Sequence, residues 1–155
     1  MEGTEFDYKQ VLTFLPQWAR GMQVFANVSA QRATGEGASN FSGFVPRSGS
    51  WGVSLSRPKF NVKLNWNYRS PARLGALTGR GLEPGTFEWR SKKMLQDIYA
   101  DYAVTKHLGV FASLRNVGST PEDVKRFGPT TPEIARFRQR QDYGSAWIFG
   151  LKGTF

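Results

Sequence analysis

The residues of this chain that could do chemistry are few and scattered. Four carboxylates lie in segments of alternating polarity: Glu5, Asp7, Asp97 and Asp101. Carboxylate pairs that hydrolyse glycosides need a shared cleft and an acid whose pKa is raised. These acids alternate with apolar residues, and Lys9 and Lys63 lie in similar segments. We therefore interpret them as part of a polar wall, and we expect no catalytic residue and no enzyme activity.

The sequence contains no motif for binding a metal, a cofactor or a nucleotide. The sequence has no cysteine and a single histidine, His107, with no nucleophile near it in sequence. A disulfide, a cysteine-ligated metal and a multi-histidine metal site are therefore excluded. Gly35 and Gly37 begin a glycine-rich stretch, but it lacks the Gly-Lys-Ser/Thr ending of a phosphate loop. We expect no metal and no cofactor.

Basic residues outnumber acidic ones, 21 to 12, which gives a net charge of +9. Such a surplus favours nucleic acid or another anionic partner. Many of the cations lie between the alternating segments: Arg73, Arg80, Arg90, Lys92, Lys125, Arg126, Arg136, Arg138 and Arg140. The aromatic residues alternate with the strand cations and so fall on the opposite face, unlike a base-stacking platform. We predict no nucleic-acid partner; the cations meet lipopolysaccharide phosphates or an anionic ligand, or are simply solvated.

Seven segments alternate between apolar and polar residues, which predicts β-strands with two different faces. They span residues 4–14, 22–32, 50–56, 60–69, 93–104, 108–117 and 145–155. The clearest is 60–69, in which Phe60, Val62 and Leu64 alternate with polar residues. The fold class is therefore predicted to be all-β and antiparallel.

The connections between these segments alternate strictly in length. Short ones (16–20, 57–59, 105–107) are followed by long ones (33–49, 70–91, 118–144). Up-and-down transmembrane β-barrels have short periplasmic turns, long extracellular loops and strands of about ten residues. This pattern predicts a barrel segment of about seven strands with Phe155 at the periplasmic end.

The apolar face of these segments is rich in aromatic residues. We predict that six of them face lipid: Tyr8, Trp66, Tyr68, Tyr102, Trp147 and Phe149. A soluble β-sandwich would show the same alternation. The asymmetry of the connections and the aromatic final segment favour the membrane protein. The sequence has no run of 18 apolar residues, so no transmembrane helix is predicted, and the first residues lack the apolar core of a signal peptide.

Four motifs resemble the C-terminal part of TonB-dependent receptors of the Gram-negative outer membrane. They are YKQVLTFLPQWARGMQVFANVS (8–29), FNVKLNWNYRS (60–70), SLRNVGSTP (113–121) and the last strand, which ends in Phe155. The resemblance covers the chain from 1 to 155. It implies a 22-stranded barrel around a plug, driven by the TonB energy-transducing system through that plug. This chain would supply the last seven strands, as a fragment that is not functional alone.

The same resemblance implies further partners and sites. The barrel-assembly machinery would recognise the last strand, where Gly150 and Phe155 match its signal and Ile148 and Gly153 depart from it. Ligand contacts would come from the last long loop, with Arg136, Phe137, Arg138 and Tyr143 as candidates. The expected location is the outer membrane, in contact with its lipid and lipopolysaccharide, and the expected role is uptake of a siderophore, cobalamin or glycan.

Two alternatives remain open at this stage. One is a small complete outer-membrane barrel of eight strands with a structural or adhesive role, which needs one more strand. The other is a soluble basic β protein that binds an anionic partner, which predicts solubility without detergent.

Overall fold

The computed structural model describes residues 2–35 and 41–153, and in these residues the chain is all-β. The elements are β1 (Glu2–Leu12), β2 (Met22–Arg32), β3 (Arg47–Ser56), β4 (Phe60–Arg69), β5 (Ala72–Ala76), β6 (Phe87–Arg90), β7 (Lys93–Ala103), β8 (Leu108–Arg115), β9 (Glu122–Phe127), the short 3₁₀ helix η2 (Glu133–Ala135), β10 (Phe137–Gln141) and β11 (Ala146–Gly153). Within the described residues, no helix has the length and apolar composition needed to cross a membrane.

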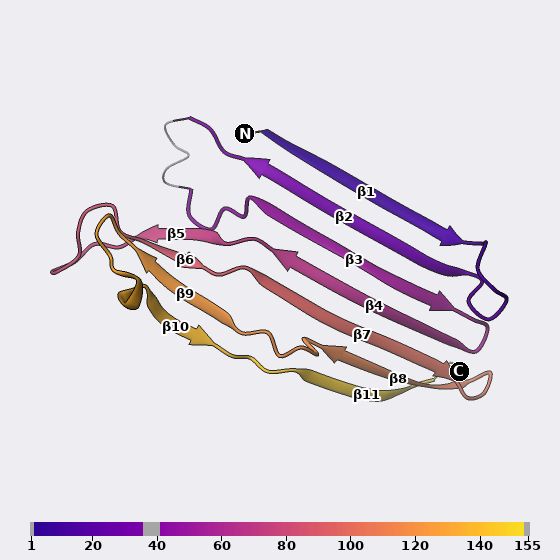
Figure 1. The fold of residues 1–155 in the computed structure, drawn as a ribbon. Coiled ribbons are helices and arrows are strands. Elements are labelled where there is room, and N and C mark those ends of the chain that lie inside the picture. Colours follow the sequence, from indigo (N-terminus) through magenta and orange to yellow (C-terminus); the bar gives the residue numbers. More distant parts are fainter. Residues whose placement is uncertain (1, 36–40, 154–155) are drawn as a thin grey trace.

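Seven long strands form one antiparallel sheet in the order β1-β2-β3-β4-β7-β8-β11. Each strand therefore pairs with the long strands nearest to it along the chain. The short connections lie at one end of the sheet, and β1 begins at the opposite end (Figure 1). The sheet is open in the described residues, because β1 and β11 are its edges and do not pair with each other. Since the number of strands is odd, these two edges run in the same direction.

Four shorter strands form a second antiparallel sheet, in the order β10-β9-β6-β5. We call this sheet the extension. Only two residues separate β4 from β5, and two separate β6 from β7, so the extension prolongs the long hairpins beyond the first sheet (Figure 1). Its register shifts between Arg73 and Ala76 and again between Phe137 and Gln139.

All seven predicted strands are present, and β2 and β4 have the predicted limits. The prediction that 70–91 and 118–144 are loops was wrong in part, because they contain β5, β6, β9 and β10. These strands have four to six residues, too few for their alternation to stand out from that of a polar loop. β3 begins before residue 50, at Arg47, and β1 ends at Leu12 rather than at Phe14. Residues 36–40 of the predicted loop 33–49, and Phe155, lie outside the described residues.

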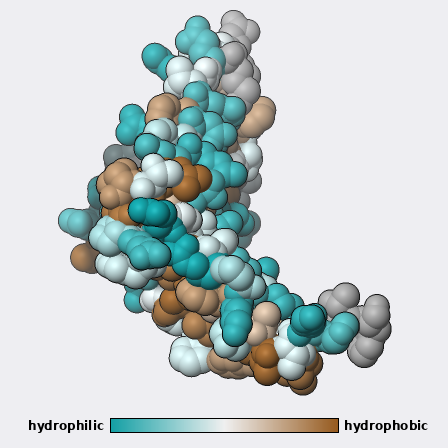
Figure 2. All heavy atoms as spheres, turned by 90° about the vertical axis from the view of Figure 1, so that its right-hand side faces the viewer, coloured by the Kyte–Doolittle hydropathy of each residue, from teal (hydrophilic) through white to brown (hydrophobic). Residues whose placement is uncertain are grey.

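Little of the described chain is buried. The buried apolar residues are Ala19, Ala72 and Val124, and the buried polar ones are Ser70, Thr86 and Glu122. None of the six lies within the strands of the seven-stranded sheet. Seen from the end with the short connections, the molecule is curved, and hydrophobic residues gather in the lower part of the view (Figure 2). The long strands therefore form a single layer without a conventional core.

Arg57 joins two short connections at this end of the sheet. It follows β3, and its guanidinium donates hydrogen bonds to the carbonyl oxygens of Trp18 (2.8 Å) and Arg20. Ala19, between these two residues, is 2% exposed. The connection from β1 to β2 is thereby held against the tight turn from β3 to β4.

Candidate functional site

One face of the seven-stranded sheet is apolar across all seven strands. Residues directly opposite each other in an antiparallel pair point to the same side. Tyr8 pairs with Ala26, Ala26 with Trp51, and Trp51 with Trp66, so the same side continues from β1 to β4. The larger apolar residues of this apolar face are Phe6, Tyr8, Leu12, Met22, Val24, Val28, Trp51, Val53, Leu55, Phe60, Val62, Leu64, Trp66, Tyr68, Met94, Ile98, Tyr102, Leu108, Val110, Leu114, Trp147, Phe149 and Leu151.

The six aromatic residues predicted to face lipid all lie on the apolar face. They are Tyr8, Trp66, Tyr68, Tyr102, Trp147 and Phe149. No described residue covers the last strand, where Trp147 is 63%, Phe149 68% and Leu151 73% exposed. Contact of these side chains with lipid stays a prediction.

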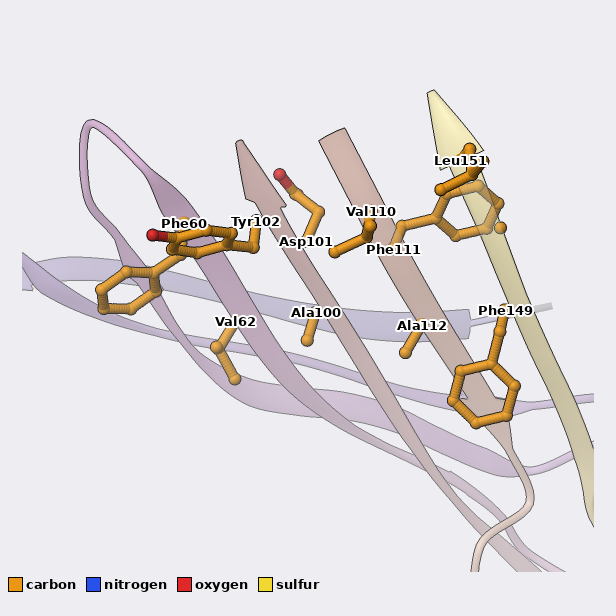
Figure 3. Close-up of a pocket in the computed structure, with 11 residues that line it drawn as sticks. Phe60, Val62, Ala100, Asp101, Tyr102, Val110, Phe111, Ala112, Phe149 and Leu151 are labelled. Atoms are coloured by element: carbon orange, nitrogen blue, oxygen red, sulfur yellow. The ribbon is translucent and has the colours of Figure 1, made fainter. Parts of the chain in front are cut away.

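The apolar face has a shallow hollow of about 680 Å³ near the short connections. Its floor is the paired Ala100 and Ala112, flanked by Val62 and Phe149 in a row across β4, β7, β8 and β11 (Figure 3). Asp101 extends to the other side of the strand from Ala100 (Figure 3). The hollow arises because small residues stand between large ones, and it carries no polar group on its floor.

The opposite face, which we call the polar face, is held by hydrogen bonds between strands. Asp101 accepts from the Lys152 amine (2.7 Å) and the Asn61 amide (3.2 Å). Asp97 accepts from the Asn67 amide at 3.3 Å. These contacts agree with the interpretation of the acids as parts of a polar wall.

The four predicted wall carboxylates do not come together. Glu5 and Asp7 lie on β1, at the edge of the sheet, whereas Asp97 and Asp101 lie on β7 with three strands between. They therefore share no cleft.

Two glycines of the polar face are covered by aromatic rings from the neighbouring strand. Gly150 pairs with Phe111, and a methyl group at Gly150 would lie 2.6 Å from the Phe111 ring. Gly52 pairs with Phe25 in the same way, and the Lys63 amine lies 5.0 Å from the centre of that ring. Gly150 thus leaves room for the Phe111 ring, and its place in an assembly signal stays a prediction. Phe155, its predicted partner, lies outside the described residues.

Where the sheet meets the extension, one carboxylate stands among three cations. Glu122 lies 3.2 Å from Arg69 Nη2, 3.3 Å from Arg90 Nε and 3.4 Å from Lys93 Nζ. Its side chain is 9% exposed, against 29%, 47% and 17% for the three cations. Since Arg69 pairs with Lys93 on the polar face, this junction cluster continues that face into the extension.

A second charged group lies further along the same face of the extension. Glu88 is two residues before Arg90 on β6, so the two side chains point to the same side. Glu88 is opposite Arg126 on β9 and forms an ion pair with Arg138 of β10. We call Glu88, Arg126 and Arg138 the upper cluster. The Nε atoms of Arg69 and Arg126 are buried and have no hydrogen-bond partner.

The four predicted ligand-contact residues separate into two pairs. Arg138 belongs to the upper cluster, and the ring of Tyr143 lies 5.1 Å from Lys93 Nζ of the junction cluster. Arg136 instead lies over the Phe127 ring at 5.3 Å, and Phe137 is exposed at the start of β10. The structure therefore brings two of the four to the charged face and leaves the other two away from it.

Sequence reasoning missed the junction cluster. Its members come from the ends of four strands, namely Arg69, Arg90, Lys93 and Glu122. The available signal was the short alternation FEWR and EDVKRF, which continues the long strands into the predicted loops.

The other face of the extension has a hollow of about 590 Å³, and its lining residues are Pro71, Trp89, Arg90, Ser91, Lys92, Lys125 and Phe127. The Trp89 and Phe127 rings meet edge to face, with 6.2 Å between their centres.

An exposed ion pair also belongs to the extension. Arg140 donates to both carboxylate oxygens of Asp123, at 2.8 and 3.1 Å. The hydrogen bond from Arg140, followed by the charges of Arg140 and Lys125, lowers the pKa of Asp123 despite an opposing desolvation effect.

Within the described residues, no three His, Cys, Asp or Glu side chains are grouped to hold a metal ion. No protein-family model matches the chain, and neither curated proteins nor solved structures show a significant match to it.

Proposed function

We propose that this chain is part of the β-barrel of a TonB-dependent receptor in the outer membrane of a Gram-negative bacterium. The receptor would take up a scarce nutrient such as a siderophore, cobalamin or glycan. The observation that carries the proposal is the apolar face, which continues across seven strands, is uncovered in the described residues and is backed by a polar face.

The energetics of this face favour lipid over water. Exposed apolar surface costs about 25 cal/mol per Å², and a soluble monomer rarely leaves a continuous apolar patch of this extent uncovered. In a membrane the same side chains contact hydrocarbon, and the opposite face borders an aqueous lumen. β1, β2 and β7 have 11 residues each and β3 and β4 have ten, which suits a tilted strand crossing the hydrocarbon core.

The two open edges also favour a larger barrel. Unpaired backbone groups in hydrocarbon each cost several kcal/mol, so β1 and β11 need further strands beside them. Because both edges run in the same direction, an all-antiparallel closure needs an odd number of further strands. One strand would complete an eight-stranded barrel, and about fifteen would complete the 22 strands of the large transporters. The resemblance of the sequence motifs to TonB-dependent receptors favours the larger number.

The partners follow from the same proposal. Membrane lipid would contact the apolar face, and the barrel-assembly machinery would act on β11. Lipopolysaccharide phosphates would meet Lys92 and Lys125 beside the aromatic hollow of the extension. The TonB system would act through a plug domain, which is not among these residues. No catalytic step belongs to the proposal.

Cysteine labelling along β4 tests whether the apolar face lies against lipid. Each introduced cysteine is labelled specifically, because the sequence has no cysteine of its own. Single cysteines are placed at 61, 62, 63, 64, 65 and 66 in the full-length protein that carries this chain, and each is given a fluorophore. We expect lipid-borne quenchers to act at 62, 64 and 66 and water-soluble quenchers at 61, 63 and 65. Recovery of the protein from the aqueous fraction without detergent, or equal quenching at both parities, would contradict the proposal and favour a soluble β protein.

A further inference from the structure

We propose that the polar face of the extension binds a small soluble solute that carries two oxyanion groups. The inference rests on the proposed function in one respect, namely that this face borders the lumen and is open to solutes from outside. The binding residues are the cations of the junction cluster and of the upper cluster.

The first reason is the charge balance of the junction cluster. Three cations surround the single carboxylate of Glu122 at 3.2 to 3.4 Å, which leaves an excess of two positive charges. Among the residues that the structure describes, the Lys93 amine alone makes a hydrogen bond to that carboxylate, and Arg69 Nε has no hydrogen-bond partner. A second oxyanion at this position would offset the repulsion among the cations and accept the hydrogen bonds that Glu122 leaves unmade.

The second reason is that the arrangement is repeated along the strand. In the upper cluster Arg138 forms an ion pair with Glu88, and Arg126 lies directly opposite Glu88 on β9. Glu88 and Arg90 are two residues apart on β6, so the two clusters are separated by roughly 7 Å along the strand. Arg90 and Arg138 have side chains 47% and 44% exposed, so one accessible arginine stands in each cluster. Two cationic positions at this spacing suit two oxyanion groups on one molecule.

The position of the two clusters on the polar face favours a soluble ligand over a lipid head group. By strand register both clusters continue the polar face, opposite the side that carries Trp89 and Lys125, and Arg90 alone of their residues also lines the hollow on that side. Under the proposed function, lipopolysaccharide would lie against the apolar side and its phosphates would not reach the polar one. The proposal therefore commits to a soluble ligand.

Calorimetric titration of the full-length protein in neutral detergent tests this site, with pyrophosphate as the two-group probe and orthophosphate as the one-group probe. We expect pyrophosphate to bind about tenfold more tightly than orthophosphate. Arg90→Gln and Arg138→Gln should each weaken pyrophosphate about fivefold or more, because each removes a charge-assisted contact. Arg140→Gln is the matched control: Arg140 is an exposed arginine of β10 that pairs with Asp123 on the other face, and its loss should leave binding unchanged.

Several outcomes would overturn the inference. Equal affinities for the two probes, or equal weakening by Arg140→Gln, would mean that only general positive charge attracts anions. Binding to lipopolysaccharide vesicles that Arg90→Gln abolishes, without binding of pyrophosphate, would assign the cluster to a lipid head group. Arg90→Lys, which keeps the charge, should retain most of the affinity if the glutamine variant does not fold. The quenching pattern along β4 tests separately whether the apolar face lies against lipid, so either proposal can fail while the other stands.

Discussion

β6 leads into β7 after two residues, yet the two strands belong to sheets with different surroundings. The seven-stranded sheet has long strands in regular register, and the buried residues described within its strands are two glycines, Gly52 and Gly109. The extension has short strands, register shifts and a small buried centre that includes Ala72, Thr86 and Val124. Its charged residues pair across strands, as Glu122 does with three cations.

This difference shows how the same hairpins can have one part suited to lipid and another part suited to water. The extension buries a few of its own residues and carries ion pairs, which suits contact with water. The strands of the seven-stranded sheet pair with one another through their backbones, but no other described layer covers the apolar face. Its stability must therefore come in large part from what surrounds it, which under our proposal is lipid.

The sharpest test of this comparison is an arginine in each region. Leu64→Arg places a charge on the apolar face, and we expect it to lower the free energy of unfolding by about 2–4 kcal/mol if that face meets hydrocarbon. Ile134→Arg, at a 94% exposed position in η2 between β9 and β10 of the extension, should change the free energy of unfolding by less than about 0.5 kcal/mol. Urea unfolding of the full-length protein in lipid vesicles, followed by tryptophan fluorescence, measures both. Similar small effects would remove the distinction between the two regions.

A methyl group added to a glycine in each region should have the next largest effect. In Gly52→Ala the new methyl would lie 2.3 Å from the Leu64 carbonyl oxygen and 2.7 Å from the Phe25 ring, so we expect a loss of about 1–3 kcal/mol. Gly75 in β5 has no atom within 4 Å of that position, and Gly75→Ala should be neutral or stabilise by up to about 1 kcal/mol. The same unfolding assay applies, and an equally small effect of both substitutions would show that Phe25 and its strand shift at little cost.

Removal of one carboxylate from each region compares their ion pairs. Glu122→Gln leaves three cations without a counter-charge, and we expect a loss of about 1–2 kcal/mol. Asp101→Asn leaves only Lys152, which is 50% exposed, and should cost less than about 1 kcal/mol. Because salt screens the repulsion among the cations, the Glu122→Gln defect should shrink as salt is raised. The contrary result is a larger loss from Asp101→Asn than from Glu122→Gln.

The smallest expected effect is a dependence on pH confined to the extension. The pKa of Asp123 is lower in the folded state than in the unfolded state, chiefly through the hydrogen bond from Arg140. The ionised carboxylate therefore stabilises the extension above its unfolded pKa, and this stabilisation is lost as pH falls through the folded pKa. Hydrogen exchange of β9 and β10 should accelerate over that range in the wild type and not in Asp123→Asn. Acceleration of the same size in the variant would assign the acid sensitivity to another group.

The limits of β2 and β4 and the two faces of the long strands could be predicted from sequence, because residues such as Phe60, Val62 and Leu64 alternate without interruption. The pairing partners could not, since parity places Trp51 and Trp66 on one face without making them neighbours. The extension could not be predicted because its strands are short and shift register. Two members of the junction cluster, Arg90 and Glu122, lie on strands of the extension. The position of Glu122 among three cations therefore could not be predicted from sequence either.

The position of the extension has a consequence for the order in which the chain folds. β4 and β7 pair along their full length, although the residues between them would otherwise form a long open loop. β5 and β6 lie inside that loop and pair with each other, and the Leu77 amide donates to the Thr86 carbonyl oxygen at 2.8 Å. Closing a short loop costs less entropy and takes less time than closing a long one. We expect β5 and β6 to pair first, and the pairing of β4 with β7 to follow from there toward the short connections. The extension would then set the register of the long strands during folding.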